Sequence, residues 1–135
     1  MNDRVFFDTN ILLYAFSANE PEKQRTSEKI IQAHEGCTCV QALNEFCNVC
    51  LKKWELSRAD IEDALSCIVA DCSVTAIERK TLRRALMLNE RYGYSFYDCV
   101  MLAAALECDC EVFFSEDMSS GQMIEGALEI RNPFK

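Results

Sequence analysis

Residues 5–10 read Val5-Phe6-Phe7-Asp8-Thr9-Asn10, an apolar run that stops at a carboxylate, a hydroxyl and an amide. The next six residues, 11–16, are apolar and helix-like. A buried parallel strand can deliver a polar side chain to its carboxyl end, where open α/β sheets bind their ligands. The stretch therefore predicts a buried strand, a short helix after it, and a candidate site at Asp8.

A second stretch near the end of the chain repeats this pattern. Residues 111–117 read Glu111-Val112-Phe113-Phe114-Ser115-Glu116-Asp117, again an apolar run that stops at a hydroxyl and acids. In isolation, a turn or a helix cap formed by Ser115 or Asp117 explains these polar residues. Because the pattern occurs twice, we expect two parallel strands that carry carboxylates to the same edge of one sheet.

Glu45 lies on a helix predicted over residues 41–55, whose apolar residues recur at steps of three and four. It falls off the apolar stripe, so periodicity alone makes it a solvated glutamate. Its position argues differently, because it sits in the first turns of a helix that follows a short predicted strand at residues 37–40. That order also places Glu45 near the carboxyl edge of the sheet.

Asp98 ends the stretch Ser95-Phe96-Tyr97-Asp98, which precedes an apolar run from Cys99 to Leu106. The run predicts a central, buried helix. Ser95 and Asp98 have the spacing of a capping box, which by itself explains the carboxylate without any chemistry. Capping and a binding role are compatible, because an acid at the positive end of a buried helix can also face a cation.

The rest of the chain predicts alternating helices and strands within one domain, residues 1–135. At 15.4 kDa the chain is long enough to bury a core of its own. Further helices are expected from about residue 19 to 35, 57 to 71 and 78 to 91, with strands at 73–75 and 127–131. The expected fold class is α/β.

The charge balance limits the binding modes that we expect. The chain has 22 acidic and 14 basic residues and a formal net charge of −8, which disfavours a broad, non-specific nucleic-acid coat. A nuclease remains compatible, because acids that hold divalent cations present a different surface. Two basic groups are either solvated helix faces or contacts to a polyanion; they are Lys52-Lys53 with Arg58, and Arg79-Lys80-Arg83-Arg84.

The sequence also bears on compartment and cysteine chemistry. No apolar stretch has the length of a membrane span, and residues 1–4 do not begin a secretory signal, so we expect a cytoplasmic protein without a membrane role.

Nine cysteines, an odd number, favour free thiols over a disulfide framework. Pairs such as Cys47 and Cys50 also suit zinc, but these two fall on the apolar stripe of a helix, where thiols behave as hydrophobes. His34, the only histidine, is interpreted as a surface or packing residue.

Four acids, Asp8, Glu45, Asp98 and Asp117, are thus expected at strand exits or helix starts. Carboxylates crowded in a cleft repel one another unless protons or cations neutralise them. An all-oxygen set without histidine suits Mg²⁺ or Mn²⁺ better than zinc. Such ions lower the pKa of bound water and clamp phosphodiesters, so metal-dependent phosphodiester hydrolysis is the natural chemistry.

Other phosphate and hydrolase chemistries fit less well. The four scattered glycines supply no nucleotide-binding P-loop. A haloacid-dehalogenase-type phosphatase would carry an acid where this chain has Asn10, and a phospho-receiver domain would show an acidic pair at the first strand. The single histidine weakens a serine or cysteine hydrolase.

Taken together, the ordered motifs resemble a PIN domain, and specifically the small VapC-type toxins of toxin–antitoxin pairs. They are Phe7-Asp8-Thr9-Asn10, Glu45, Ser95-Phe96-Tyr97-Asp98 with Leu102-Ala103-Ala104-Ala105, Ser115-Glu116-Asp117-Met118 and Asn132-Pro133-Phe134. The resemblance implies a three-layer α/β/α sandwich around a parallel sheet of about five strands. It also implies a Mg²⁺- or Mn²⁺-dependent endoribonuclease.

The same resemblance implies roles for particular residues. Asp8, Asp98 and Asp117 would surround one ion, with Glu45 and Asp98 towards a second. Residues Thr9, Asn10 and Ser115 would support these ligands, and Glu116 would substitute for or assist Asp117. The candidate contacts to RNA come from the two basic groups described above, not from the resemblance; they are Lys52, Lys53, Arg83 and Arg84.

Partners follow from the resemblance as well. The expected substrate is single-stranded or looped RNA, because a nuclease of this kind needs unstacked nucleotides to reach the scissile phosphate. A small antitoxin would insert a basic side chain into the acidic cleft, and the chain would form a homodimer. The alternative hypothesis is a catalytically idle PIN-like module that binds RNA or a protein partner.

Overall fold

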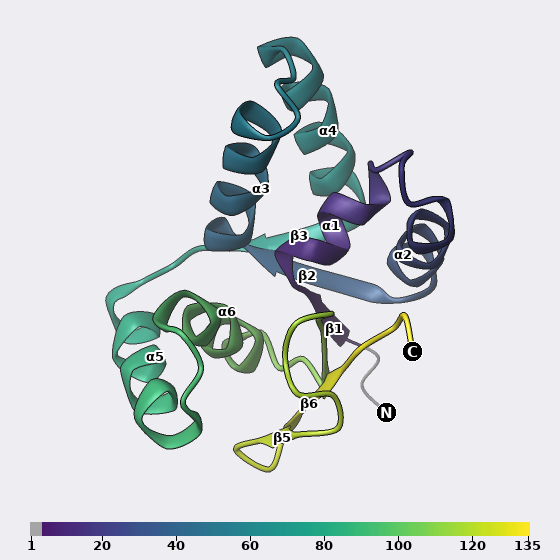
Figure 1. The fold of residues 1–135 in the computed structure, drawn as a ribbon. Coiled ribbons are helices and arrows are strands. Elements are labelled where there is room, and N and C mark those ends of the chain that lie inside the picture. Colours follow the sequence, from purple (N-terminus) through teal and green to yellow (C-terminus); the bar gives the residue numbers. More distant parts are fainter. Residues whose placement is uncertain (1–3) are drawn as a thin grey trace.

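The computed structural model describes residues 4–135; Met1, Asn2 and Asp3, on which the expectation about a secretory signal rests, lie outside this range. A six-stranded sheet has the order β3-β2-β1-β4-β6-β5 (Figure 1). Five strands run parallel, and β5 pairs antiparallel with β6. The strands are β1 (Arg4–Phe7), β2 (Glu35–Cys39), β3 (Cys72–Thr75), β4 (Val112–Phe114), β5 (Met123–Ile124) and β6 (Leu128–Arg131).

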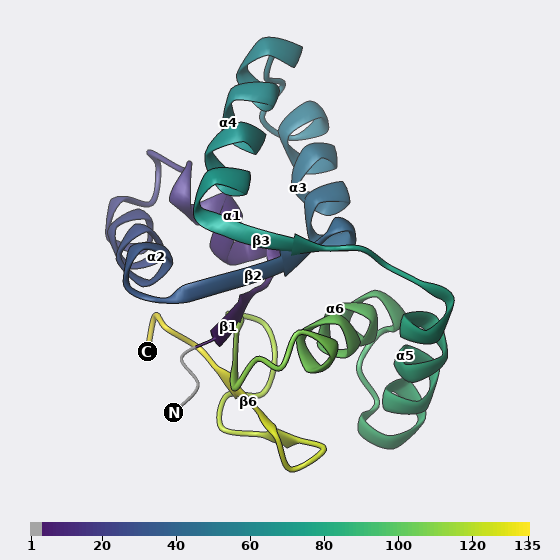
Figure 2. The ribbon, with the colours of Figure 1, turned by 180° about the vertical axis from the view of Figure 1, so that it is seen from behind.

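The helices alternate with the parallel strands, as the sequence predicts for an α/β fold. Figure 1 shows α1 and α2 on one side of β2, and α5 and α6 on the other, so the layered α/β/α prediction is confirmed. Figure 2 shows β3 continuing directly from α4 along the edge of the sheet. The helices are α1 (Thr9–Ala15), α2 (Pro21–Ala33), α3 (Val40–Lys52), α4 (Arg58–Asp71), α5 (Arg79–Tyr92) and α6 (Phe96–Glu107).

The two apolar stretches form the central strands β1 and β4. They pair in parallel with Phe7 opposite Phe114. The rings of Phe6 and Phe113 stack with centroids 5.0 Å apart, and Phe6 and Phe113 are fully buried. Because helices cover both faces of these strands, every position is apolar rather than every second one. The register brings both strands to an end at the same edge.

The central helix is α6, where all seven residues from Cys99 to Ala105 are buried. Ser95 caps it by accepting a 3.2 Å hydrogen bond from the backbone N–H of Asp98. Both features agree with the sequence analysis.

Several boundaries and one strand differ from the sequence prediction. The helix predicted over residues 41–55 ends at Lys52, three residues earlier. The second helix ends at Ala33, not near Glu35, because Glu35 and Gly36 pair with β1 at the start of β2. Val40 begins α3 and does not belong to the strand. The antiparallel β5 was not predicted, since two residues are too short to show periodicity.

Cysteines and the histidine behave as apolar and packing residues. All nine cysteines are free thiols, and six of them are buried: Cys37, Cys39, Cys50, Cys72, Cys99 and Cys110. His34 lies edge-on to Phe114, with ring centroids 5.6 Å apart. Among the helices of residues 4–135, none combines the length and the apolar character needed to cross a bilayer.

Candidate active site

Asp8 lies where β1 ends and α1 begins, and it is 5% exposed. Its backbone is extended, so that its carboxylate turns back to cap the helix. The Thr9 backbone N–H donates a 2.7 Å hydrogen bond to Asp8 Oδ1. The Ser115 hydroxyl, at the end of β4, donates a 2.7 Å hydrogen bond to Asp8 Oδ2. One oxygen of this buried carboxylate is therefore held by the first residue of α1, and the other by the residue that follows β4.

The four acids singled out in the sequence surround one pocket. It has a volume of about 200 Å³ at the carboxyl edge of the sheet. The acids come from the junction of β1 and α1, from α3, from α6 and from the segment after β4, which are far apart in the sequence but adjacent here. The lining residues are Asp8, Thr9, Asn10, Leu13, Glu45, Val49, Asp98 and Asp117.

Asp117 is oriented by an amide on α1. The Asn10 side-chain amide donates a 3.0 Å hydrogen bond to Asp117 Oδ2. The amide is itself oriented, because Asn10 Oδ1 accepts a 3.4 Å hydrogen bond from the backbone N–H of Glu116. The Asp117 backbone N–H donates to the Ser115 hydroxyl over 3.3 Å. Asn10 and Ser115 thus link both aspartates.

Glu45 faces the pocket although it lies outside the apolar stripe of α3. The Thr9 hydroxyl donates a 3.2 Å hydrogen bond to Glu45 Oε1. Gln41, one turn earlier on the helix, donates a 3.0 Å hydrogen bond to Oε2. The sequence analysis did not single out Gln41; its spacing of four residues from Glu45 is the signal that could have identified it.

Burial and crowding shift the proton affinity of two of the acids. Burial raises the pKa of Asp8 to about 7, and the hydrogen bonds from Ser115 and Thr9 oppose this rise, whereas the carboxylates of Asp98 and Glu45 add to it. Burial also raises the pKa of Asp98, against the hydrogen bond with Ser95, and the charges of Glu45 and Asp117 contribute in the same direction. The pocket thus disfavours negative charge unless a cation neutralises it.

The donor set suits a hard divalent ion. All four acids offer carboxylate oxygens, the ligands that Mg²⁺ and Mn²⁺ prefer, and the lining residues of the described chain include neither lysine nor arginine. Within residues 4–135, however, no three acidic, histidine or cysteine side chains are close enough together to hold one ion. The carboxylates of Asp8, Glu45 and Asp117 each accept hydrogen bonds from protein donors. Binding of one ion by three acids at once therefore requires side-chain rotation.

Glu116 has a different environment from the neighbouring Asp117. Its carboxylate accepts hydrogen bonds from the Tyr14 hydroxyl and from the ammonium group of Lys23 on α2. Lys23 also lies over the Tyr14 ring, 4.8 Å from its centroid. Glu116 does not line the acidic pocket. The sequence analysis singled out neither Tyr14 nor Lys23, because only the tertiary structure pairs them with Glu116.

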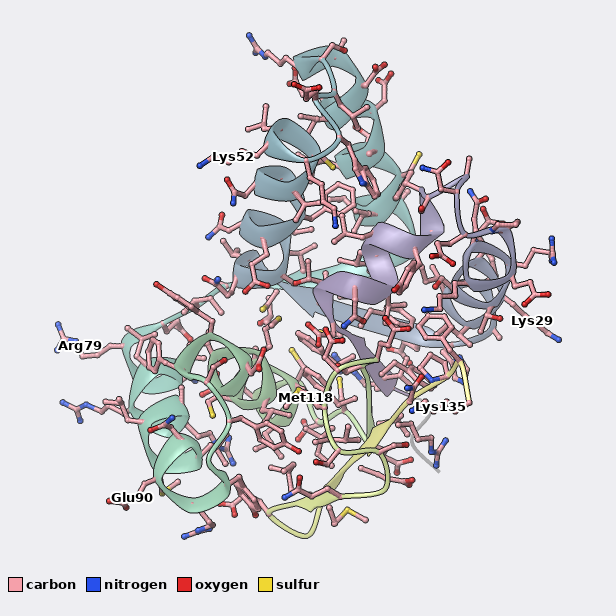
Figure 3. All side chains as sticks on the ribbon, viewed as in Figure 1. Lys29, Lys52, Arg79, Glu90, Met118 and Lys135 are labelled. Atoms are coloured by element: carbon pink, nitrogen blue, oxygen red, sulfur yellow. The ribbon has the colours of Figure 1, made fainter. Side chains whose placement is uncertain are left out.

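The four candidate RNA contacts lie on two different helices. Lys53 caps the end of α3 and lines a pocket next to the acidic one. Lys52 is exposed, and Figure 3 shows it extending outward from α3 on the side away from α1. On α5, Arg83 is exposed and Arg84 is half-buried. Neither arginine lines the acidic pocket or its neighbour.

Comparisons with known proteins extend this description. Residues 5–119 match the PIN domain family. A search of curated proteins finds no match. Among solved structures, a toxin–antitoxin complex from Klebsiella pneumoniae contains a chain with a similar fold, at a TM-score of 0.71 and 21% sequence identity. The similarity covers 96% of this chain and 97% of that chain.

Two further solved structures have similar folds. The first is VapC20 from Mycobacterium tuberculosis, described as a toxin that cleaves the sarcin–ricin loop, with a TM-score of 0.68, 16% identity and coverage of 84% and 91%. The second is VapBC2 from Rickettsia felis bound to promoter DNA, with a TM-score of 0.60, 12% identity and coverage of 84% and 88%. At these identities the similarity concerns the fold.

Proposed function

Because this chain belongs to the PIN domain family, we propose that it is a metal-dependent endoribonuclease and the toxin of a toxin–antitoxin pair. The observation that carries the proposal is the pocket lined by Asp8, Glu45, Asp98 and Asp117. Four acids without a compensating lysine or arginine in the described lining form an unfavourable arrangement unless they bind cations. Such an arrangement is typical of a site that works with metal ions.

The four acids would hold Mg²⁺ or Mn²⁺, with Asp8, Asp98 and Asp117 around one ion and Glu45 with Asp98 towards a second. When bound, such an ion supplies an activated water and stabilises the leaving oxygen of a phosphodiester. The protein's own contribution is orientation. Ser115 and Thr9 fix the Asp8 carboxylate, and Asn10 fixes Asp117.

RNA is the proposed substrate. A chain of similar fold, VapC20 from Mycobacterium tuberculosis, is described as cleaving the sarcin–ricin loop, an RNA element. The acidic pocket is open at the surface and small, which suits a single phosphodiester of an unstacked strand better than a duplex. We therefore propose single-stranded or looped RNA.

An antitoxin partner is proposed on similar grounds. Chains of similar fold occur in toxin–antitoxin complexes from Klebsiella pneumoniae and Rickettsia felis. A basic side chain from such a partner would neutralise the acidic pocket and compete with metal. The cytoplasmic location and the homodimer are also part of the proposal, and light scattering of the purified protein tests the latter.

The experiment that tests this function compares two matched substitutions. Asp98→Asn removes a carboxylate from the pocket, and Asp63→Asn removes one from the exposed face of α4. We expect Asp98→Asn to lower Mn²⁺-dependent cleavage of total cellular RNA about 100-fold or more, and Asp63→Asn to leave it unchanged. Equal cleavage by the two variants would remove the pocket from the mechanism.

A second measurement separates the nuclease from the idle module. Calorimetry of the unmodified protein with Mn²⁺ alone should detect binding that Asp98→Asn weakens. If the protein neither binds Mn²⁺ nor cleaves any RNA in a total extract, the catalytically idle PIN-like module is the better description.

A further inference from the structure

A second pocket adjoins the acidic one. It has a volume of about 260 Å³, and the two pockets share Asn10, Leu13 and Val49. The shared wall places the two pockets side by side, so that one extended ligand can contact both. The remaining lining residues of the second pocket are Tyr14, Ser17, Glu20, Lys53 and Trp54.

The side chains of the second pocket differ in character from the four acids. Two are aromatic, Tyr14 and Trp54, and one is a lysine, Lys53; Glu20 is the single acid. None of the ion pairs within residues 4–135 involves Lys53. Its ammonium group is therefore available to an anionic ligand.

The aromatic walls are held in place by the rest of the protein. The Tyr14 ring meets Phe134 edge-on, with centroids 5.2 Å apart, and its hydroxyl donates to Glu116. Trp54 is half-buried and packs against the hydrophobic core, and its backbone N–H donates a 3.1 Å hydrogen bond to the carbonyl of Val49. A ligand that stacks on these rings meets a largely preformed surface, so little ordering is required on binding.

We propose that this second pocket binds the nucleotide next to the scissile phosphodiester of single-stranded RNA, with Trp54 against the base and Lys53 near a phosphate. The proposal rests on the proposed function and names a subsite for its substrate. Two arguments support an RNA strand as the occupant. The pocket adjoins the acidic site, and it combines one unpaired cation with aromatic side chains, the combination that binds single strands without a strict sequence requirement.

The position of the subsite indicates how an RNA strand would run across the surface. A phosphodiester at the four acids, held through cations, has a neighbouring nucleotide within one repeat of the backbone. Asn10 and Leu13 on α1 line both pockets, so the RNA strand would cross α1 at these residues. A duplex cannot offer an unstacked base to Trp54, which makes the subsite selective for single strands.

Trp54 supplies its own probe, because it is the only tryptophan in the chain. The test uses the full chain carrying Asp98→Asn, which we expect to bind RNA without cleaving it. Titration with a single-stranded oligoribonucleotide of mixed sequence should quench Trp54 emission. The matched duplex should bind at least about tenfold more weakly, since stacking on an unpaired base is lost.

The contribution of the Lys53 charge to RNA binding is tested by comparing substitutions at two lysines. We expect Lys53→Ala to weaken oligonucleotide binding about tenfold and to reduce the salt dependence by about one phosphate contact. Lys29→Ala is the matched control, because Lys29 is exposed on α2 and Figure 3 shows it projecting away from the molecule. This control should bind RNA as the parent does.

Cleavage kinetics give an independent readout. In the otherwise unmodified protein, Trp54→Ala should raise KM for single-stranded RNA about tenfold with kcat nearly unchanged, and Trp54→Phe should recover most of the loss. Two results would overturn the subsite and leave the proposed nuclease function intact. The first is RNA that is cleaved in an Asp98-dependent manner but does not quench Trp54 emission. The second is equal RNA binding by the Lys53→Ala and Lys29→Ala variants. Cleavage independent of Asp98 overturns the proposed function instead.

Discussion

The Ser115 hydroxyl donates a 2.7 Å hydrogen bond to the Asp8 carboxylate across 107 positions of sequence. The contact exists because Phe7 and Phe114 are in register on neighbouring parallel strands, so the next residue of each strand leaves the sheet at the same point. Ser115 is fully buried, and its oxygen also accepts the backbone N–H of Asp117. One hydroxyl therefore orients two candidate metal ligands.

The first prediction concerns this hydroxyl. Ser115→Ala leaves Asp8 Oδ2 buried without its donor, so we expect a loss of about 1–3 kcal/mol in the free energy of unfolding. We also expect Mn²⁺ to bind about tenfold more weakly, as for other residues that orient metal ligands. Denaturant unfolding and calorimetry measure the two effects. Ser66→Ala on the exposed face of α4 is the control, and an unchanged Mn²⁺ isotherm for Ser115→Ala contradicts the orienting role.

The second prediction concerns pH. The folded-state pKa of Asp8, about 7, lies above the ordinary value of 3.8, so between these values the folded chain binds more protons than the unfolded chain. Its free energy of unfolding must therefore fall as pH rises through this window. Without metal, we expect a loss on the order of 2–3 kcal/mol between pH 5 and pH 8 from this group.

Asp8→Asn tests the origin of that loss. The amide carries no charge, so the variant should lose most of the dependence between pH 5 and pH 8 and be the more stable protein at pH 8. Urea unfolding in the presence of a chelator measures this, with Asp63→Asn as the control for removing an exposed carboxylate. If the free energy of unfolding changes with pH in the same way for Asp8→Asn and for the parent protein, Asp8 is not the origin of the loss.

The third prediction concerns Lys23. Its ion pair fixes Glu116, whose backbone N–H in turn holds Asn10 against Asp117. We expect Lys23→Met to weaken Mn²⁺ binding by up to about tenfold, because the Asp117 carboxylate loses its orientation. Lys29→Met on the same helix controls for the lost charge. Tighter Mn²⁺ binding by Lys23→Met would show instead that the released Glu116 joins the metal site.

The fourth prediction concerns the packing of β1 on β2. A Cβ atom at Gly36 would lie 2.3 Å from the ring of Phe7, which is fully buried. Gly36→Ala must displace this ring, and we expect a loss of about 1–3 kcal/mol in the free energy of unfolding. Phe7→Leu in the same chain removes the ring atoms concerned and should recover part of the loss. Full stability of Gly36→Ala alone contradicts the close approach.

The sequence predicted the elements whose physical signal is local. Consecutive apolar residues that end in Asp8 and in Ser115 indicated two buried parallel strands, and the run after Asp98 indicated the buried helix α6. Ser95 could be identified as its cap because the spacing to Asp98 is itself the interaction. Periodicity of α3 did not reveal the environment of Glu45; its place directly after a strand did.

The tertiary structure decided what depends on register and on partners distant in sequence. It set the pairing of Glu116 with Lys23 and Tyr14, which separates this acid from Asp117, and it distinguished Lys53 from Lys52. Local sequence determines where a strand or helix forms, because apolar burial and capping act over a few residues. Which side chains then meet depends on how strands align and on which helix crosses beside them, and those relationships arise only when the whole core packs.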